Sequence, residues 1–214
     1  MSLYLSRVEI DSNNRQKIRD LSHVGAYHNW VEQSFPEEFE QKIRTRKLWR
    51  IDQLHNKEYL LVVSSSQPDL TLLEKYGVAG TAASKNYDPF LNSIYEGMEA
   101  QFRITLNPSI AIKKGNHGKR GRVMPHVSYE FQEKFLMDRS LKNGFSVEAD
   151  QFQIVDRGYA LFKKANQRTV RLVKVTYQGV LRVEDKDKFI QTLTKGFGKK
   201  KAYGFGLMTI IPRS

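Results

Sequence analysis

The sequence contains no cysteine among its 214 residues. This absence excludes disulfide bonds, zinc sites built on thiolates and a cysteine nucleophile, and it fits a cytoplasmic protein. A run of about 18 apolar residues, which a membrane-spanning helix needs, is also missing. The amino terminus lacks the charged and then apolar layout of a signal peptide. We therefore expect a soluble, cytoplasmic chain that does not span a membrane.

Acidic residues are scarce relative to basic ones. The chain has 35 lysines and arginines against 23 aspartates and glutamates, so its formal net charge is +12 and its isoelectric point is near 9.8. A surplus of this size favours an anionic partner, either nucleic acid or an acidic membrane surface. Hydrophobic residues make up 40% of the chain and aromatic residues 11%, which indicates a folded protein rather than a disordered basic tail.

Histidines are few, and they are scattered at His23, His28, His55, His117 and His126. No pair has metal-site spacing backed by carboxylates, so we expect no metal and no other cofactor. A ribonuclease nevertheless needs little protein machinery, because RNA carries its own nucleophile in the 2′-hydroxyl group. It needs a base for that proton, an acid for the departing 5′-oxygen and cations near the phosphate. Histidine suits the proton transfers.

The order of predicted elements occurs twice along the chain. In the first half, apolar patterns predict a strand at 3–10, a helix at 15–34, strands at 47–53 and 58–66, a short helix at 70–75 and a loop at 77–89. In the second half they predict strands at 100–106, 145–155, 170–183 and 207–212, with helices at 128–143 and 186–195. We therefore expect an α+β protein of two tandem ferredoxin-like (RRM-like, βαββαβ) domains, residues 1–94 and 95–214, with a glycine-rich loop near the carboxyl terminus.

The first predicted helix has an apolar stripe with 3, 4, 3, 4 spacing, formed by Leu21, Val24, His28, Val31 and Phe35. Periodicity by itself therefore favours His28 as a packed or hydrogen-bonded histidine on the inner face of the helix. By the same reasoning Tyr27 is an ordinary packing aromatic.

Three basic segments lie in the second half, at 113–122, 163–171 and 195–201. Each by itself is more often a solvated charged loop, but the three together favour nucleic acid, because A-form RNA exposes its phosphates and a wide minor groove. The last segment opens a stretch, 196–206, that holds four of the fourteen glycines within eleven residues. Composition leaves two interpretations open: a loop whose main-chain N–H groups hold a polyanion, or a helix-ending glycine and a basic turn into a last strand.

Six motifs, each weak alone, form an ordered set over nearly the whole chain. They are Tyr4-Leu5-Ser6-Arg7-Val8, a histidine eight residues before a proline (His28 and Pro36), Phe102-Arg103-Ile104-Thr105-Leu106-Asn107-Pro108, Gly118-Lys119-Arg120, Tyr177-Gln178-Gly179-Val180-Leu181 and Gly196-Phe197-Gly198-Lys199-Lys200-Lys201-Ala202-Tyr203-Gly204-Phe205-Gly206-Leu207. This ordered set resembles the CRISPR-associated CasE family.

The resemblance implies two ferredoxin-like domains and a metal-independent endoribonuclease of the type I-E CRISPR system. The family cuts precursor CRISPR RNA at the 3′ base of the repeat stem-loop by attack of the 2′-hydroxyl group, which leaves a 2′,3′-cyclic phosphate and a 5′-hydroxyl. It then stays on the RNA as a subunit of the Cascade complex. The implied partners are the CRISPR repeat RNA hairpin, the mature guide RNA and the other Cascade subunits, with no cofactor.

Carried over residue by residue, the resemblance places His28 at the family's catalytic histidine, against the packed interpretation. Gly25 stands where some members have a catalytic tyrosine, and Tyr27 is the nearest substitute, although adjacent helix positions face about 100° apart. Arg171 lies near a family basic residue and is expected to steady the scissile phosphate. The residues expected to bind RNA are Lys113, Lys114, Lys119, Arg120, Arg122, Lys163, Lys164, Arg168, Gly198, Lys199, Lys200 and Lys201.

Two other functions stay open at this point. A repeat-RNA binding subunit would cap the RNA hairpin without cutting it, and the glycine at position 25 keeps this alternative in play. A general RNA-binding or ribosome-associated protein would show no preference for a CRISPR repeat hairpin. A cleavage assay on a synthetic repeat separates the enzyme from the first alternative.

Overall fold

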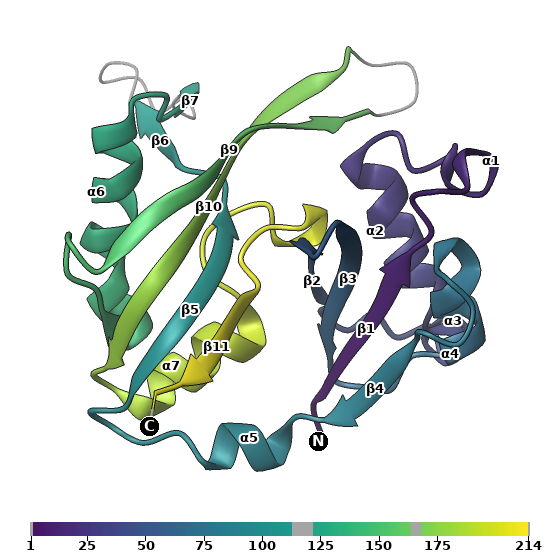
Figure 1. Cartoon of the computed structure of the whole chain (residues 1–214), viewed down its shortest axis with the longest axis horizontal. Coiled ribbons are helices and arrows are strands. Elements are labelled where there is room, and N and C mark those ends of the chain that lie inside the picture. The colour runs from purple at the N-terminus through teal and green to yellow at the C-terminus, as the bar shows by residue number, and fades with distance from the viewer. Residues whose placement is uncertain (1, 113–121, 164–167, 214) are drawn as a thin grey trace.

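The computed structural model describes residues 2–112, 122–163 and 168–213. Figure 1 shows two lobes side by side, each an antiparallel sheet covered by helices, and α5 (Asp88–Asn92) lies between them in the chain. In the described part of the chain, no helix is long and apolar enough to cross a membrane. Five of the residues expected to bind RNA lie outside the described residues, namely Lys113, Lys114, Lys119, Arg120 and Lys164, and Arg122 is described by its backbone alone.

The first sheet has the strand order β2–β3–β1–β4, and every neighbouring pair is antiparallel. Its strands are β1 (Tyr4–Ile10), β2 (Leu48–Leu54), β3 (Lys57–Ser64) and β4 (Ala83–Asn86). His55 and Asn56 join β2 to β3 with φ angles of 50° and 60°, the left-handed pair that a tight hairpin requires. Helices follow β1 and β3, so this lobe has the ferredoxin-like order that the sequence predicts.

The predicted single helix at 15–34 is wrong. The chain forms α1 (Arg15–Ile18) and α2 (Val24–Gln33), followed by α3 (Pro36–Glu40). His23 separates α1 from α2 because its backbone is extended and its Nδ1 accepts a hydrogen bond from the Gly25 N–H at 3.0 Å, as a helix N-cap does. The new boundary leaves α2 with Trp30 and Val31 buried in the core of the first lobe.

The segment 77–89, predicted as a loop, contains β4 and the start of α5. β4 reads Ala83-Ser84-Lys85-Asn86 and carries no apolar alternation, so the sequence pattern gives no strand signal there. Its pairing with β1 decides its structure. α4 (Leu70–Leu73) and the 3₁₀ helix η1 (Glu74–Tyr76) precede it.

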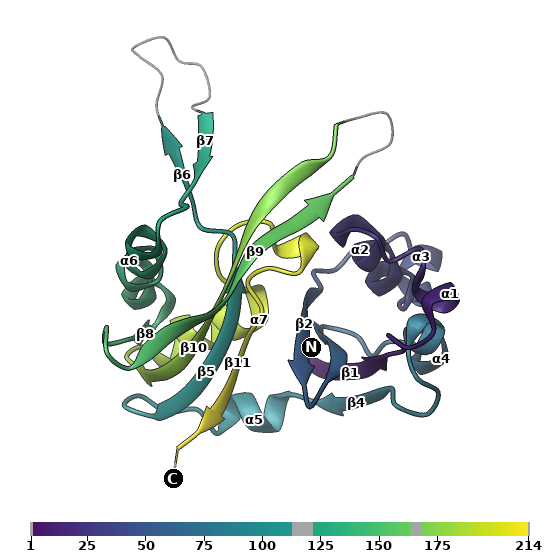
Figure 2. The ribbon, with the colours of Figure 1, turned by 45° about the horizontal axis from the view of Figure 1, so that its top comes forward.

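The second sheet has the order β11–β5–β10–β8, and β9 also pairs with β10. Its strands are β5 (Glu99–Leu106), β8 (Phe145–Ser146), β9 (Phe152–Phe162), β10 (Val170–Val183) and β11 (Met208–Pro212). Its helices are α6 (Tyr129–Ser140), the 3₁₀ helix η2 (Leu141–Asn143) and α7 (Lys186–Lys195). A separate hairpin of β6 (Ser109–Ile112) and β7 (Arg122–Pro125) projects from this lobe (Figure 2).

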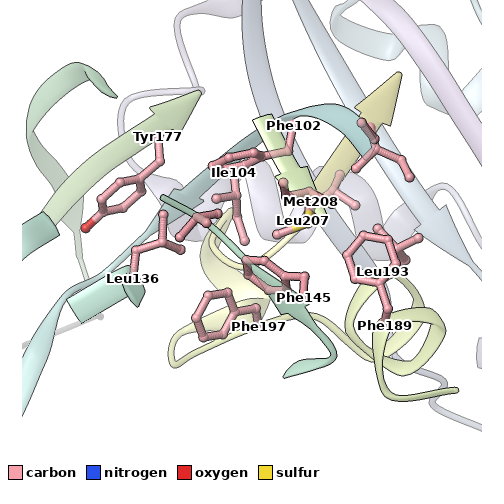
Figure 3. Close-up of a cluster of buried hydrophobic side chains, with 14 of the residues drawn as sticks. Phe102, Ile104, Leu136, Phe145, Tyr177, Phe189, Leu193, Phe197, Leu207 and Met208 are labelled. Carbon is pink, nitrogen blue, oxygen red and sulfur yellow. The ribbon is translucent and has the colours of Figure 1, made fainter. Parts of the chain in front are cut away.

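The core of the second lobe extends into the first. Figure 3 shows Phe145 beside Phe189 and Phe197, and its ring centroid lies 5.9 Å and 6.1 Å from theirs, edge to face. Leu48 and Val63, from the first sheet, belong to the same buried cluster. The two lobes therefore share apolar packing at their junction.

Arg50 of β2 adds a polar tie between the lobes. Its side chain is 1% exposed, and its guanidinium pairs with both carboxylate oxygens of Asp52 at 2.7 and 2.6 Å. The same group donates to the carbonyl oxygens of Arg103 at 2.6 Å and Leu207 at 2.8 Å, and to Thr209 Oγ1 at 2.7 Å, all in the second lobe. Every N–H of Arg50 has an acceptor, so this contact orients one sheet against the other.

Candidate active site

His28 lies on α2 with 23% of its side chain exposed. Its neighbours Trp30 and Val31 point into the core of the first lobe, whereas the His28 ring meets the edge of the Tyr203 ring with centroids 5.7 Å apart. Tyr203 belongs to η3 (Lys201–Tyr203), a 3₁₀ turn in the glycine-rich loop. His28 is therefore a partly exposed residue at the junction of the two lobes, and not a sealed core histidine.

Charged side chains on two segments surround His28. Glu32, one turn later on α2, places Oε1 3.8 Å from His28 Nδ1. Arg44 and Lys47 follow in the connection to β2. Burial lowers the pKa of His28, Glu32 opposes this shift, and Arg44 and Lys47 add to it, with a net lowering. At neutral pH the imidazole is therefore mainly neutral, which is the form that accepts a proton.

Tyr203 is a site residue that the sequence interpretation missed. Its ring lies between His28 and Phe162, at the end of β9, with 4.4 Å between the Tyr203 and Phe162 centroids. Tyr203 brings together an N-terminal helix, a C-terminal loop and the long β9–β10 hairpin. The available signal was an aromatic residue among glycines and lysines, but only the tertiary contact ties it to His28.

Tyr27 occupies a different environment. Its ring stacks on Trp49 of β2 at 5.9 Å and 23°, and it packs against the core of the first lobe. Burial, with a smaller contribution from Glu58, raises the pKa of Tyr27. The phenol therefore stays protonated, and its ring supports α2 from the core side.

Gly25 leaves room for the cap of α2. A Cβ atom at this position would come within 2.9 Å of the His23 ring and 3.5 Å of Phe162. Because the His23 ring caps the helix, a tyrosine here would require the ring to move. Glycine at position 25 therefore allows the His23 ring to cap α2.

The glycines of the carboxyl-terminal loop serve packing. Cβ atoms at Gly196, Gly204 and Gly206 would lie 2.6 Å from Leu48, 2.7 Å from Trp49 and 2.3 Å from the Phe197 carbonyl oxygen, and all three glycines have positive φ. Gly196 also ends α7 as its C-cap. Gly198 is different, because the nearest atom to a Cβ there is Leu106 Cδ2 at 3.6 Å. Three of the four glycines thus support the structural interpretation that composition left open.

The lysines of the same loop divide into two groups. Lys199 and Lys200 are exposed. Lys201 donates from Nζ to the Lys195 carbonyl oxygen at 2.9 Å, and burial, with a smaller contribution from Arg46, lowers its pKa. Lys201 is therefore partly engaged inside the loop, whereas the other two face solvent.

The β9–β10 hairpin reaches toward α2, as Figures 1 and 2 both show. Lys163, Arg168 and Arg171 are exposed at its described end, and Lys163 directly follows Phe162 in the chain. The structure thus brings this basic hairpin to the side of the molecule that holds His28. The β6–β7 hairpin, which includes Arg122, projects from the other side of the second lobe, away from α2 (Figure 2).

A cleft of about 500 Å³ opens between the two sheets, and Tyr203 and Gly204 are among its lining residues. Asp156 and Lys174, which pair at 2.7 Å, also line it. Over the described ranges, no group of three or more histidine, aspartate or glutamate side chains is arranged to hold a metal ion. The groups that the structure places around His28 are the Glu32 carboxylate, the Tyr203 ring and the cations of Arg44 and Lys47.

A protein-family model described as "CRISPR associated protein" matches residues 3–212. The chain is 25% identical over 218 residues to the CRISPR-associated endoribonuclease Cse3 of Thermus thermophilus. The alignment covers 98% of this chain and 100% of that protein. The structure is similar to Thermus thermophilus Cse3 bound to an RNA representing a pre-cleavage complex, with a TM-score of 0.80, 23% identity and coverage of 99% and 100%. It is also similar to a chain of a CRISPR RNA-guided surveillance complex, with a TM-score of 0.64, 17% identity and coverage of 98% and 100%. The structural likeness confirms the two ferredoxin-like domains.

Proposed function

Because the chain belongs to the CRISPR-associated protein family, as its resemblance to CasE indicated, we propose that it is an endoribonuclease that processes CRISPR repeat RNA. The observation that carries this proposal is the partly exposed His28, held between Glu32 and Tyr203 on the side of the molecule that the basic hairpin reaches. The endoribonuclease named among its relatives supports the same activity.

In the proposed mechanism, neutral His28 takes the proton of the RNA 2′-hydroxyl group. The 2′-oxygen attacks the adjacent phosphorus while the bond to the 5′-oxygen breaks, and that oxygen takes up a proton from water. His28 then returns its proton to the solvent. The products are a 2′,3′-cyclic phosphate and a 5′-hydroxyl. Arg171 steadies the charge of the phosphate, and Tyr27, stacked on Trp49, supports the helix that carries His28.

Binding of the repeat hairpin falls to the exposed basic residues in this proposal. Lys163, Arg168, Lys199 and Lys200 contact RNA phosphates, and the residues at 113–122 keep the RNA-binding role expected from their composition. We also propose that the chain keeps its product, the mature guide RNA, as a subunit of the Cascade complex, since a similar chain occurs in a surveillance complex. The two domains divide at residues 94 and 95 in this proposal, between the end of β4 at Asn86 and the start of β5 at Glu99.

Cleavage of a synthetic repeat hairpin tests the proposal. We expect His28→Ala to lose cleavage by roughly 10²-fold or more, since a positioned acid–base group contributes about that much, while the affinity for the hairpin stays unchanged. His55→Asn is the matched control, because His55 lies in the exposed β2–β3 turn with a φ of 50° that asparagine tolerates. Cleavage is expected to continue in EDTA.

A non-catalytic binding subunit is the second candidate, and Gly25 at the family's tyrosine position favours it. That function predicts tight hairpin binding by the wild-type chain without any cut product.

Two outcomes would contradict the proposed ribonuclease mechanism. Cleavage by the His28→Ala variant at the wild-type rate would remove His28 from the mechanism, and a strict requirement for Mg²⁺ would contradict a metal-free reaction.

A further inference from the structure

The carboxylate of Glu32 is shared between His28 and two cations, the exposed Arg44 and the buried Lys47. Its Oε1 faces His28 Nδ1 at 3.8 Å, and its Oε2 lies 3.4 Å from Arg44 Nε and 3.5 Å from Lys47 Nζ. The Glu32 side chain is only 13% exposed. Contacts on both oxygens keep the carboxylate in place.

Lys47 is held independently of Glu32. Its side chain is 1% exposed, and its Nζ lies 2.6 Å from Glu38 Oε2 and 4.8 Å from the centre of the Phe35 ring. Neutralising Glu32 would therefore leave Lys47 with a carboxylate partner. The charge of Lys47 is therefore neutralised by Glu38 even without Glu32, so balancing that charge does not by itself explain the position of Glu32.

The direction of the Glu32 contact bears on proton transfer. A carboxylate beside Nδ1 favours a proton on that nitrogen, and a neutral imidazole with its proton on Nδ1 has its lone pair on Nε2. The separation of 3.8 Å exceeds a hydrogen bond, so the effect of Glu32 is electrostatic orientation. Tyr203 limits the rotation of the His28 ring from another side, because the two ring centroids lie 5.7 Å apart in an edge contact.

We propose that Glu32 is a positioning residue for His28, which keeps the proton on Nδ1 and leaves Nε2 free to accept the proton of the 2′-hydroxyl group. This inference rests on the proposed function. Glu32 also stabilises the imidazolium that forms once the proton has moved, against the neighbouring charges of Arg44 and Lys47. Tyr203 is the titratable group that faces His28 from the second lobe.

The test is a titration of the His28 ring by NMR in the free, full-length protein, with the signal assigned by its loss in His28→Ala. Because Glu32 raises the pKa of His28 against the effect of burial, Glu32→Gln is expected to lower that pKa and to shift the ring toward a mixture of Nδ1-H and Nε2-H tautomers. Glu37→Gln, the same chemical change at an exposed site on α3, is expected to leave both unchanged.

Cleavage supplies the second readout. Glu32→Gln is expected to slow cleavage roughly tenfold, a part of the ~10²–10⁴-fold effect of a positioned base, without changing RNA affinity. The acidic limb of its pH–rate profile is expected to move to lower pH, following the lower pKa of His28. Glu32→Asp keeps the charge with a shorter reach, so its rate is expected to lie between those of Glu32→Gln and the wild type.

The two readouts separate the inference from the proposed function. A His28 pKa and tautomer that are equal in Glu32→Gln and Glu37→Gln would overturn the role of Glu32, whatever the cleavage rate. If the pKa of His28 shifts in Glu32→Gln but the wild-type chain does not cut RNA, the proposed ribonuclease function is wrong. The electrostatic contact between Glu32 and His28 would still be confirmed.

Discussion

Replacing Arg50 with methionine tests how the two lobes are held together. Methionine keeps much of the apolar volume of the side chain and removes every N–H donor. The carbonyl oxygens of Arg103 and Leu207 would lose donors at 2.6 and 2.8 Å, and Asp52 would lose its bidentate partner. These groups lie at the lobe junction, so the variant tests the interface itself.

The expected loss of stability is about 3–5 kcal/mol. Removing one partner of a buried ion pair costs roughly that amount, and each carbonyl oxygen left without a donor costs about 1–3 kcal/mol. Asp52 is 19% exposed and retains Arg103 Nε at 3.5 Å, so solvent and this neighbour limit the penalty at its carboxylate. Since total stability of a folded protein is about 5–15 kcal/mol, Arg50→Met removes a large fraction of it.

Guanidinium chloride unfolding, followed by tryptophan fluorescence and by circular dichroism, measures this loss. Arg19→Met is the matched control, because the Arg19 side chain is 73% exposed and pairs only loosely with Asp20 at 3.7 Å. The control is expected to stay within about 0.5 kcal/mol of the wild type. A variant within about 1 kcal/mol of the wild type would refute the reasoning.

Two further predictions concern the glycine-rich loop and the basic hairpin. Gly204→Ala is expected to destabilise the protein by about 1–3 kcal/mol, because its Cβ would lie 2.7 Å from Trp49 at a φ of 82°. Gly198→Ala, at a φ of 81° but with space around it, is expected to cost less. Guanidinium chloride unfolding of both variants measures the difference, and equal losses would contradict the packing explanation. Lys163→Ala and Arg168→Ala are each expected to weaken binding of a repeat hairpin and to reduce the slope of log Kd against log salt by about 1, since each removes one phosphate contact. Lys142→Ala, at an exposed position in η2, serves as the control, and an unchanged slope in the hairpin variants would place the RNA elsewhere.

Much of the fold was predictable from local patterns. The alternation in β1, the continuous apolar run in β3, the apolar spacing of α7 and the glycine that ends it all act within a few residues. The sequence therefore displays them directly. The errors arose where a specific hydrogen-bonding contact, and not the apolar pattern, decides the structure. β4 has no apolar alternation and becomes a strand by pairing with β1, and His23 divides a periodic helix by capping it.

The candidate site, like the fold, was only partly visible in the sequence. The type and position of His28 were visible in the motif, and the basic character of the 163–171 segment was visible in its composition. Its environment was not visible, because Tyr203 is far from His28 in the chain and meets it only when the glycine-rich loop packs on β2.

By itself, therefore, the sequence determined the family, the repeated βαββαβ order, the positive charge and the presence of one candidate catalytic histidine. The tertiary structure alone decided that Arg50 ties the lobes together, that three glycines allow close packing at Leu48, Trp49 and the Phe197 carbonyl, and that Tyr203 meets the His28 ring. The physical reason is range: secondary structure and net charge depend on neighbours in the chain, whereas the protonation and orientation of a side chain depend on groups that folding brings within a few ångströms.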